Sequence, residues 1–154
     1  MPPTAVPLFS VVINTYNRAS SLPQTLEGLR YLNYPAVEVV VVNGPSTDGT
    51  EELLARWQGR IKVARCAARN LSVSRNVGIC AAAGEFVAFI DDDAVPEPEW
   101  LDQLLAGYDS PLVGATGGIV YDHTGYSFQY QYSTATRLGN ANWNLTEPAL
   151  HLCY

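Results

Sequence analysis

Three consecutive aspartates, Asp91, Asp92 and Asp93, are the residues of this sequence with the clearest capacity for chemistry. They directly follow the apolar run at residues 86–90, whose composition predicts a buried β-strand. Adjacent carboxylates repel one another, and a bound cation relieves that repulsion. Mg²⁺ and Mn²⁺ usually bind through one or two carboxylates together with substrate phosphates. The triplet therefore indicates a metal site; the alternative is that it caps the next helix or faces water.

Two more polar segments leave apolar runs in the same abrupt way. Residues 14–18 follow the apolar run at 8–13, and residues 43–48 follow the valine-rich run at 37–42. In an open α/β sheet, ligands bind at the carboxyl ends of the strands, where the loops of neighbouring units meet. We therefore expect these two segments and the aspartates to line one site.

Short apolar runs alternate with amphipathic stretches along the chain, which predicts parallel β-α-β units in an α/β fold. Strands are predicted at residues 8–13, 37–42, 61–64, 86–90 and 113–121. Helices are predicted at 22–32, 51–60 and 70–83, and from Pro96 or Pro98 through Leu105, with Gly84 as a C-cap and Asp48 as an N-cap. After Asp122 the pattern fades, and no element is predicted there.

Length and composition fit one packed domain and exclude several classes of protein. The chain has 154 residues, of which 47% are hydrophobic and 16% charged. Its net charge of −6 and scattered basic residues argue against a nucleic-acid-binding surface. The sequence has no recognisable signal peptide, so secretion is not predicted. It also has no apolar run of about 20 residues, so a membrane span is not predicted. Three dispersed cysteines, Cys66, Cys80 and Cys153, are typical of reduced thiols in a cytosolic protein.

Four motifs in order give the sequence a family resemblance. They are VVINTYNR at residues 11–18, VVVNGPSTDGT at 40–50, SRNVG at 74–78 and FIDDDAVPEPEWL at 89–101. Together they resemble the family 2 glycosyltransferases of GT-A fold over residues 8 to 121. The resemblance implies a three-layer α/β/α, Rossmann-like GT-A sheet that is mostly parallel. It also implies that residues 1–154 are a single GT-A domain forming the donor-binding half, truncated so that the acceptor half is absent after Tyr154.

The resemblance assigns roles to polar residues around the expected nucleotide. Thr15, Tyr16 and Arg18 are implied to lie against the nucleotide, with Tyr16 stacking on the base; the alternative for Tyr16 is an aromatic of the core. Asn43 stands where the family commonly has an aspartate that reads the base edge, and an amide can both donate and accept there. Arg75 is implied to approach the nucleotide or diphosphate, the alternative being a surface arginine.

For the aspartates, the resemblance implies a D-x-D motif in which Asp91 is the first aspartate and Asp93 the last. Asp93, with Asp91, is implied to bind Mn²⁺ or Mg²⁺, and Asp92 or Asp91 to meet the ribose. The metal would stabilise the leaving nucleoside diphosphate as a Lewis acid. No acceptor-side base is identifiable: Asp122 and His123 lie outside any motif and are more typical of a loop surface.

The implied activity is metal-assisted, inverting transfer of a sugar from a nucleoside-diphosphate donor to an acceptor hydroxyl. A UDP-sugar is the favoured donor, with GDP or TDP as alternatives, and the acceptor is a glycan, lipid or protein. The expected location is cytoplasmic, at the membrane surface if the acceptor or missing segments bring it there. The alternative function is a non-catalytic fragment that holds nucleotide and metal. Dinucleotide-binding and P-loop signatures are absent, which disfavours those classes.

Overall fold

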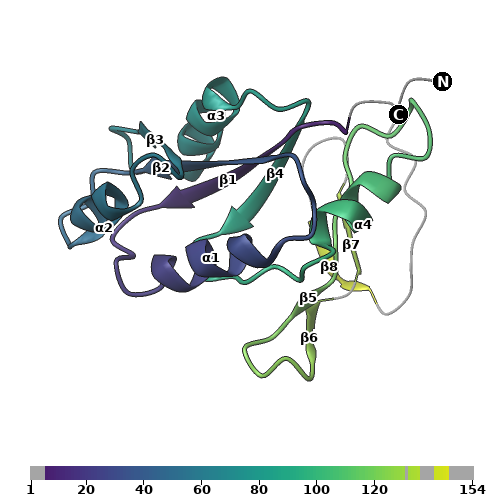
Figure 1. The fold of residues 1–154 in the computed structure, drawn as a ribbon. Helices are drawn as coiled ribbons and strands as arrows, with labels where there is room; N and C mark the ends of the chain where they lie inside the picture. The colour runs from purple at the N-terminus through teal and green to yellow at the C-terminus, as the bar shows by residue number, and fades with distance from the viewer. Residues whose placement is uncertain (1–5, 131, 136–140, 146–154) are drawn as a thin grey trace. The chain divides into compact units, whose positions relative to one another are not determined.

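The computed structural model describes residues 6–130, 132–135 and 141–145 (Figure 1). The chain divides into two compact units, Met1–Leu105 and Ala106–Tyr154. All of the predicted substrate-binding and metal-binding residues belong to the first unit.

The first unit is built on a four-stranded parallel sheet with the strand order β3-β2-β1-β4 (Figure 1). The strands are β1 (Phe9–Thr15), β2 (Val37–Asn43), β3 (Lys62–Arg65) and β4 (Phe86–Asp91). All four predicted strands of this unit are confirmed. Pairing of β1, β2 and β4 continues beyond their apolar runs, because main-chain hydrogen bonding does not depend on side-chain type. It therefore brings Asn14, Thr15, Asn43 and Asp91 into the sheet.

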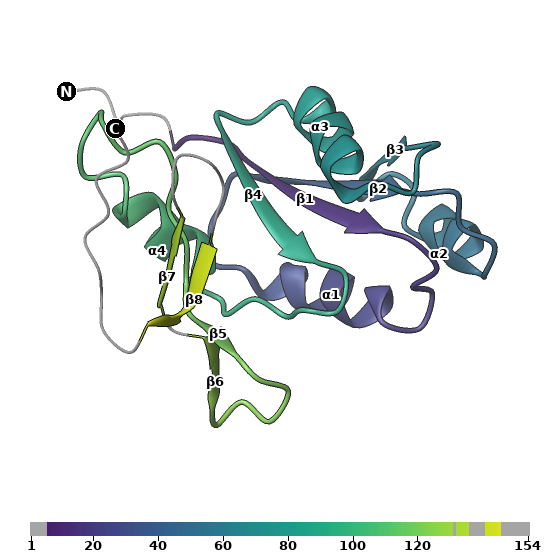
Figure 2. The ribbon, with the colours of Figure 1, turned by 180° about the vertical axis from the view of Figure 1, so that it is seen from behind.

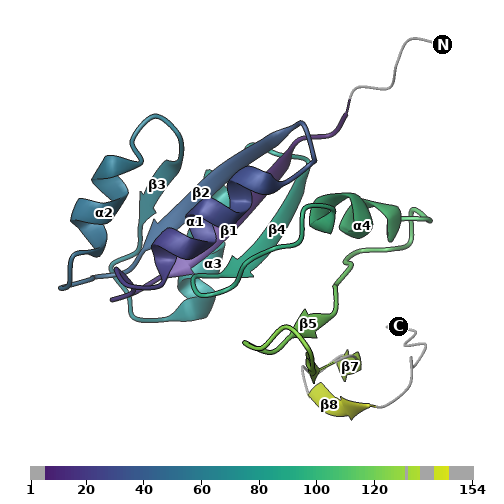
Figure 3. The same ribbon diagram turned by 60° about the horizontal axis from the view of Figure 1, so that its bottom comes forward.

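Helices cover both faces of this sheet. They are α1 (Leu22–Gly28), the 3-10 turn η1 (Leu29–Tyr31), α2 (Thr50–Arg56), α3 (Leu71–Ala81) and α4 (Trp100–Ala106). Figures 1 and 2 show α1 and α3 on opposite faces, and Figure 3 shows α1 lying across β1 and β2. The predicted three-layer α/β/α arrangement is confirmed. In the part of the chain that the structure describes, no helix combines the length and apolar composition needed to cross a membrane.

The core follows from the alternation of side chains along the central strand. Val11 and Ile13 pack in the larger cluster, with residues of α1, α2 and α4, whereas Val12 packs in the smaller cluster beside α3. All three are completely buried. Burying each such side chain stabilises the fold by roughly 1.5–3 kcal/mol. A strand buried on both faces explains why this run has no polar residue at alternate positions after Ser10.

The ends of α3 differ in part from the sequence prediction. Asn70 is the N-cap, and its side chain accepts a hydrogen bond from the Val73 N–H at 3.1 Å. The predicted C-cap, Gly84, is wrong: the helix ends at Ala81, with Ala82 as the C-cap. Gly84 has another use, since a Cβ there would lie 2.6 Å from the Leu8 carbonyl oxygen. The glycine permits a close approach of two backbone segments.

In the described residues of the second unit, the strands form two antiparallel pairs. β5 (Val120–Tyr121) pairs with β6 (Phe128–Tyr130), and β7 (Tyr132–Ala135) pairs with β8 (Ala141–Leu145). The predicted strand at 113–121 is wrong except for its last two residues. Its glycines were expected to permit close backbone approach, yet a Cβ at Gly114, Gly117 or Gly118 would meet no atom within 4 Å. Without a packed surface to offset their backbone entropy, these glycines disfavour a strand.

Candidate functional site

Two cavities lie at the carboxyl ends of β1, β2 and β4. The first has a volume of about 240 Å³, and the residues around it include Asn14, Thr15, Tyr16, Gly44, Arg69 and Ser74. The second has a volume of about 300 Å³ and is lined by Asn14, Tyr16, Arg18, Leu71, Asp91, Asp92 and Asp93. Asn14, Tyr16 and Leu71 line both cavities. The structure thus brings the predicted loop after β1 together with the aspartate triplet.

Hydrogen bonds join the loop after β1 to the loop after β2. The Gly44 N–H donates to the Thr15 carbonyl at 2.8 Å. The Thr47 N–H donates to Asn17 Oδ1 at 2.7 Å, and the Asn17 N–H donates to Ser46 Oγ at 3.0 Å. Asn17 has a φ of 55°, a left-handed conformation that asparagine tolerates better than most residues. These bonds hold the wall of the first cavity in one conformation.

Asp48 reinforces this junction. Its Oδ2 accepts from the Ala19 N–H at 3.0 Å, and its Oδ1 accepts from the Thr50 N–H at 3.0 Å and from the Thr50 hydroxyl. The hydrogen bond from the Thr50 hydroxyl is the main reason that the pKa of Asp48 is lowered. The N-cap of α2 is Gly49, one residue later than predicted. Asp48 nevertheless satisfies a backbone donor at the start of that helix, as a capping residue does.

Tyr16 and Arg69 meet in the first cavity. The guanidinium carbon of Arg69 lies 4.8 Å from the centre of the Tyr16 ring, within the range of a cation–π contact. Tyr16 is half-buried, and Gly44 lies against it: a Cβ at residue 44 would come within 3.3 Å of the Tyr16 Cβ. The ring is therefore at the cavity surface, held on one side by the Gly44 backbone.

Thr15 places a buried hydroxyl between this cavity and the aspartates. The residue is only 4% exposed, and its Oγ1 makes no hydrogen bond of ordinary geometry with any described residue. It is close enough to Asp92 to favour the charged form of that carboxyl. A buried hydroxyl without a full partner is costly, so a ligand or water that completed its hydrogen bonding would be favoured here.

The three aspartates differ in environment although they are adjacent: Asp91 ends β4, and Asp92 and Asp93 lie in the turn that follows, where the Ala94 N–H donates to the Asp91 carbonyl. Asp91 and Asp93 are exposed, whereas Asp92 is 8% exposed. Arg18 Nε lies 3.7 Å from Asp92 Oδ1. Burial raises the pKa of Asp92, and the neighbouring Asp91 and Asp93 raise it further, while Thr15 and Arg18 act in the opposite direction. Arg18 thus faces an aspartate rather than the solvent alone.

The two exposed carboxylates, Asp91 and Asp93, suit a hard cation that also binds phosphate. Among the described residues, no three His, Cys, Asp or Glu side chains are grouped closely enough to hold a metal by themselves. Mg²⁺ and Mn²⁺ do not require such a group, since they commonly use one or two carboxylates and complete their coordination with phosphates and water. Asp91 and Asp93 provide this kind of donor set at the second cavity.

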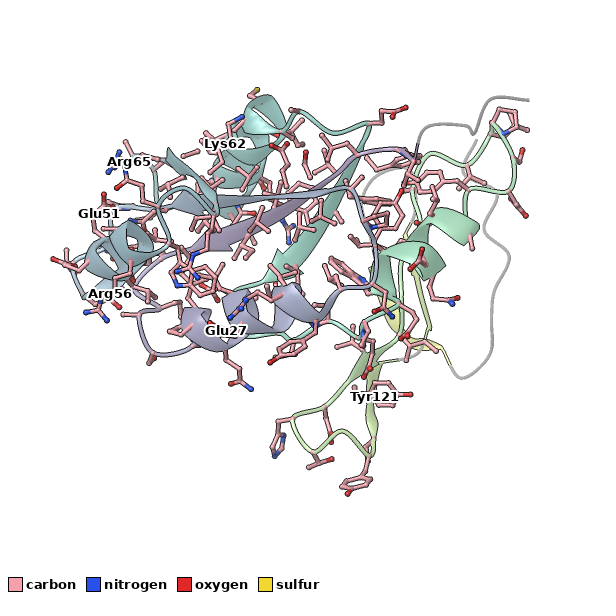
Figure 4. All side chains as sticks on the ribbon, viewed as in Figure 1. Glu27, Glu51, Arg56, Lys62, Arg65 and Tyr121 are labelled. Carbon is pink, nitrogen blue, oxygen red and sulfur yellow. The ribbon has the colours of Figure 1, made fainter. Side chains whose placement is uncertain are left out.

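Asn43 lies beneath the loops and lines neither cavity. It is 3% exposed; its Nδ2 donates to Glu51 Oε2 at 2.9 Å, and its Oδ1 accepts from Ser46 Oγ at 2.7 Å. Glu51 also pairs with Arg65, and Figure 4 shows these two side chains together. Hydrogen bonds from Arg65 and then Asn43 lower the pKa of Glu51. The predicted contact of Asn43 with a base remains a prediction.

Arg75 is an exposed residue of α3 that also lines neither cavity. Its guanidinium carbon lies 5.6 Å from the centre of the Phe89 ring on β4. This contact agrees with the alternative of a surface arginine, while an approach to a diphosphate remains a prediction.

Asn14, Ser74 and Arg69 line the cavities but were given no functional role from the sequence. Asn14 Nδ2 donates to Ser74 Oγ at 2.6 Å, which ties the end of β1 to α3, and Arg69 covers Tyr16. Asn14 was recognised only as part of a polar segment. Ser74 is 7% exposed, and a buried serine at helical spacing from Gly78 is a weak signal in a sequence. Nothing in the sequence pointed to Arg69, because its contact with the Tyr16 ring depends on the conformation of its loop.

Comparison with known proteins supports the resemblance seen in the sequence. A family model described as Glycosyl transferase family 2 matches residues 10–152. The chain belongs to this family. The aspartate triplet and the Tyr16 cavity both lie within the matched region.

Individual relatives are similar over most of this chain. Putative glycosyltransferase EpsH of Bacillus subtilis is 34% identical over 124 residues, which covers 77% of this chain and 36% of EpsH. The mannosyltransferase PcManGT from Pyrobaculum calidifontis, solved with GDP-Man and Mn²⁺, has a TM-score of 0.64 and 30% identity, covering 73% of this chain and 35% of that one. S. aureus TarS 1-349 with UDP-GlcNAc has a TM-score of 0.57 and 26% identity, covering 75% and 38%.

These similarities confirm the Rossmann-like GT-A sheet. This family 2 glycosyltransferase chain spans between 35% and 38% of the length of the three relatives. The activity of the whole protein is therefore a separate question from the identity of its fold.

Proposed function

We propose that residues 1–154 form the donor-binding half of a GT-A glycosyltransferase domain. The nucleoside lies in the first cavity and the diphosphate lies at the second. The observation that supports this most directly is that the two cavities share Asn14, Tyr16 and Leu71. A nucleoside diphosphate has an aromatic base at one end and two phosphates at the other, and it fits an aromatic cavity that opens onto exposed carboxylates.

In this proposal each side chain has a role suited to its chemistry. Tyr16 stacks on the base, and Arg69 lies at the same cavity surface. The unsatisfied Thr15 hydroxyl hydrogen-bonds to the bound nucleotide. Arg18 lies against the nucleotide and near Asp92, whose charged form it favours. Asn43, beneath the loops, is proposed as an outer contact of the base, and Arg75, exposed on α3, as an outer contact of the diphosphate.

Asp93, with Asp91, is proposed to hold Mn²⁺ or Mg²⁺, while Asp92 or Asp91 meets the ribose. The D-x-D assignment is supported by the exposure of the two outer carboxylates and by the Mn²⁺ in the PcManGT complex. A bound divalent cation supplies Lewis-acid stabilisation of the departing diphosphate. The protein contributes the carboxylates, the stacking surface and the orientation of the donor.

The full reaction that we propose is inverting transfer of a sugar to an acceptor hydroxyl. A UDP-sugar is the favoured donor, with GDP or TDP as alternatives; the titles of the TarS and PcManGT complexes name UDP-GlcNAc and GDP-Man for those proteins. The acceptor is a glycan, lipid or protein, and the protein acts in the cytoplasm. A nucleotide-binding fragment without catalysis is the second candidate, because no acceptor-side base is identifiable in the sequence.

Calorimetric titration of the chain with UDP, GDP and TDP, each with and without Mn²⁺, tests the proposal. We expect one nucleotide to bind more tightly with Mn²⁺. Asp93→Ala should weaken the Mn²⁺-dependent binding by about tenfold or more, since it removes one of few protein ligands. Glu85→Ala is the matched control, because it removes an exposed carboxylate at the opposite end of β4.

The outcomes separate the two candidate functions. If no nucleotide binds, or if Asp93→Ala behaves like Glu85→Ala, the donor site is wrong. If nucleotides bind but no free sugar is released from UDP-glucose, UDP-GlcNAc or GDP-mannose over hours, the binding fragment is the better description of this chain.

A further inference from the structure

A short segment formed by Gly44 and Pro45 lines the first cavity. The residues on either side of it, Asn43 and Ser46, are joined by a hydrogen bond from the Ser46 hydroxyl to Asn43 Oδ1 at 2.7 Å. The main chain bends at the same place, since the Ser46 N–H donates to the Gly44 carbonyl at 2.8 Å. The conformation of this part of the cavity wall therefore depends on the direction in which the Asn43 amide points.

Glu51, in the first turn of α2, determines the orientation of that amide. Its Oε2 accepts from Asn43 Nδ2 at 2.9 Å. A hydrogen bond from Arg65 is the largest reason that the pKa of Glu51 is lowered, so this carboxyl is ionised at neutral pH and can only accept. An amide turned over would place Asn43 Oδ1 against the carboxylate, where two acceptors repel each other. Glu51 thus keeps Nδ2 on its own side and Oδ1 on the side of Ser46.

The same chain of hydrogen bonds reaches the loop that carries Tyr16. The Asn17 N–H donates to Ser46 Oγ at 3.0 Å, while the hydroxyl of Ser46 donates to Asn43. Tyr16 directly precedes Asn17 and lines the first cavity. Glu51 lines neither cavity. It is connected to the wall of the first cavity through other residues, without being placed to touch a base.

We propose that Glu51 is a positioning residue for the base-binding wall of the first cavity. This inference rests on the proposed function, in which the nucleoside occupies that cavity. Glu51 acts through Asn43 and Ser46, because it sets the direction of the hydrogen bonds that hold the loop after β2 against the loop after β1. The carboxylates proposed to hold the metal line the second cavity, so loss of Glu51 should weaken nucleotide binding without changing what Mn²⁺ adds to it.

The test measures the binding of UDP by calorimetry with and without Mn²⁺, with GDP or TDP in its place if that nucleotide is the one that binds. Glu51→Ala should weaken binding about tenfold under both conditions, so that the gain from Mn²⁺ stays the same. Glu51→Gln keeps the size of the side chain but can donate as well as accept, so the Asn43 amide is free to take either orientation. This variant should weaken binding about threefold.

Two comparisons separate positioning from a general effect on stability. Glu52→Ala is the matched control, because it removes the other exposed carboxylate in the first turn of α2, with the same interaction with the helix N-terminus, and should leave UDP binding unchanged. Ser46→Ala breaks the chain of hydrogen bonds at another point. The loss of affinity in the double variant of Glu51→Ala and Ser46→Ala should therefore be smaller than the product of the two single losses. The urea midpoint of each variant reports folding independently.

The inference is overturned if Glu51→Ala binds UDP as tightly as Glu52→Ala does, if the gain from Mn²⁺ falls in Glu51→Ala, or if the two single losses multiply in the double variant. Each of these results leaves the proposed function intact, because nucleotide binding is still measured. Absence of binding by the wild-type protein with every nucleotide overturns both the proposed function and this inference.

Discussion

Replacing Gly78 with alanine should destabilise the first unit, although alanine is the better helix former. Gly78 follows Ser74 by one turn of α3, and both are buried against the sheet. A Cβ at residue 78 would lie 2.4 Å from Val12 Cγ1 and 3.3 Å from Val42 Cγ2. The helix can approach the sheet this closely only because residue 78 has no side chain.

The expected size follows from two opposing effects. Alanine gains about 1 kcal/mol over glycine in a helix interior. An extra methyl group in a packed core costs about 1–3 kcal/mol, and a 2.4 Å approach favours the upper end, since carbon atoms are normally about 3.5–4.0 Å apart. Val12 is completely buried and β-branched, so it has little freedom to rotate away. We expect a net loss of about 2 kcal/mol in the free energy of unfolding.

Urea unfolding followed by tryptophan fluorescence measures this loss as a lower midpoint with an unchanged slope. Ser72→Ala, at an exposed position of the same helix, is the control and should be neutral or slightly stabilising. In the double variant with Val12→Ala, the methyl group that clashes is gone, so the combined loss should be smaller than the sum of the single losses. A Gly78→Ala protein at least as stable as the wild type would refute the close packing of α3 on β1.

Three other substitutions probe contacts that stabilise the first unit. Gly84→Ala should cost about 3 kcal/mol or more, because its Cβ would lie 2.7 Å from the Ser10 backbone nitrogen, which cannot move aside. Asn70→Ala should cost about 1 kcal/mol, since α3 loses its side-chain cap on Val73. Glu38→Gln should cost about 1 kcal/mol at pH 7, with the difference from wild type shrinking as the pH falls below about 4.

The pH dependence of Glu38 follows from the cause of its pKa shift. A hydrogen bond from the Ser10 hydroxyl is the largest reason that the pKa of Glu38 is lowered, and the Ala83 N–H and Lys62 add to it. Stability from a lowered carboxyl pKa is present above the unfolded value and is lost as the pH falls through the folded value. Urea midpoints between pH 3 and pH 7 measure it; a difference between wild type and Glu38→Gln that grows at low pH would contradict this assignment. An unchanged urea midpoint in Gly84→Ala would contradict the close backbone approach at residue 84. An unchanged midpoint in Asn70→Ala would contradict the capping role of Asn70.

The strands and helices of the first unit could be predicted from the sequence because burial imposes a periodic pattern of apolar residues. The apolar runs of β1 and β2 sit between two layers of helices, and a strand buried on both faces must be apolar throughout. The predicted burial of the run at 86–90 is only partly correct, because β4 is an edge strand and its Phe89 is 38% exposed. The predicted strand at 113–121 failed because its residues are small and apolar without being buried; Ile119 is 54% exposed. A local pattern of apolar residues does not show whether the folded chain provides a surface for them to pack against.

The sequence by itself determined the parallel sheet, the family and the position of Asp91, Asp92 and Asp93 at a strand end, because these depend on local order and composition. Only the tertiary structure decided which aspartate is buried, that Asn14 lies beside Asp91, and that Arg69 covers Tyr16. Strand pairing and loop packing join residues that are distant along the chain, and the burial that raises the pKa of Asp92 exists only after they meet.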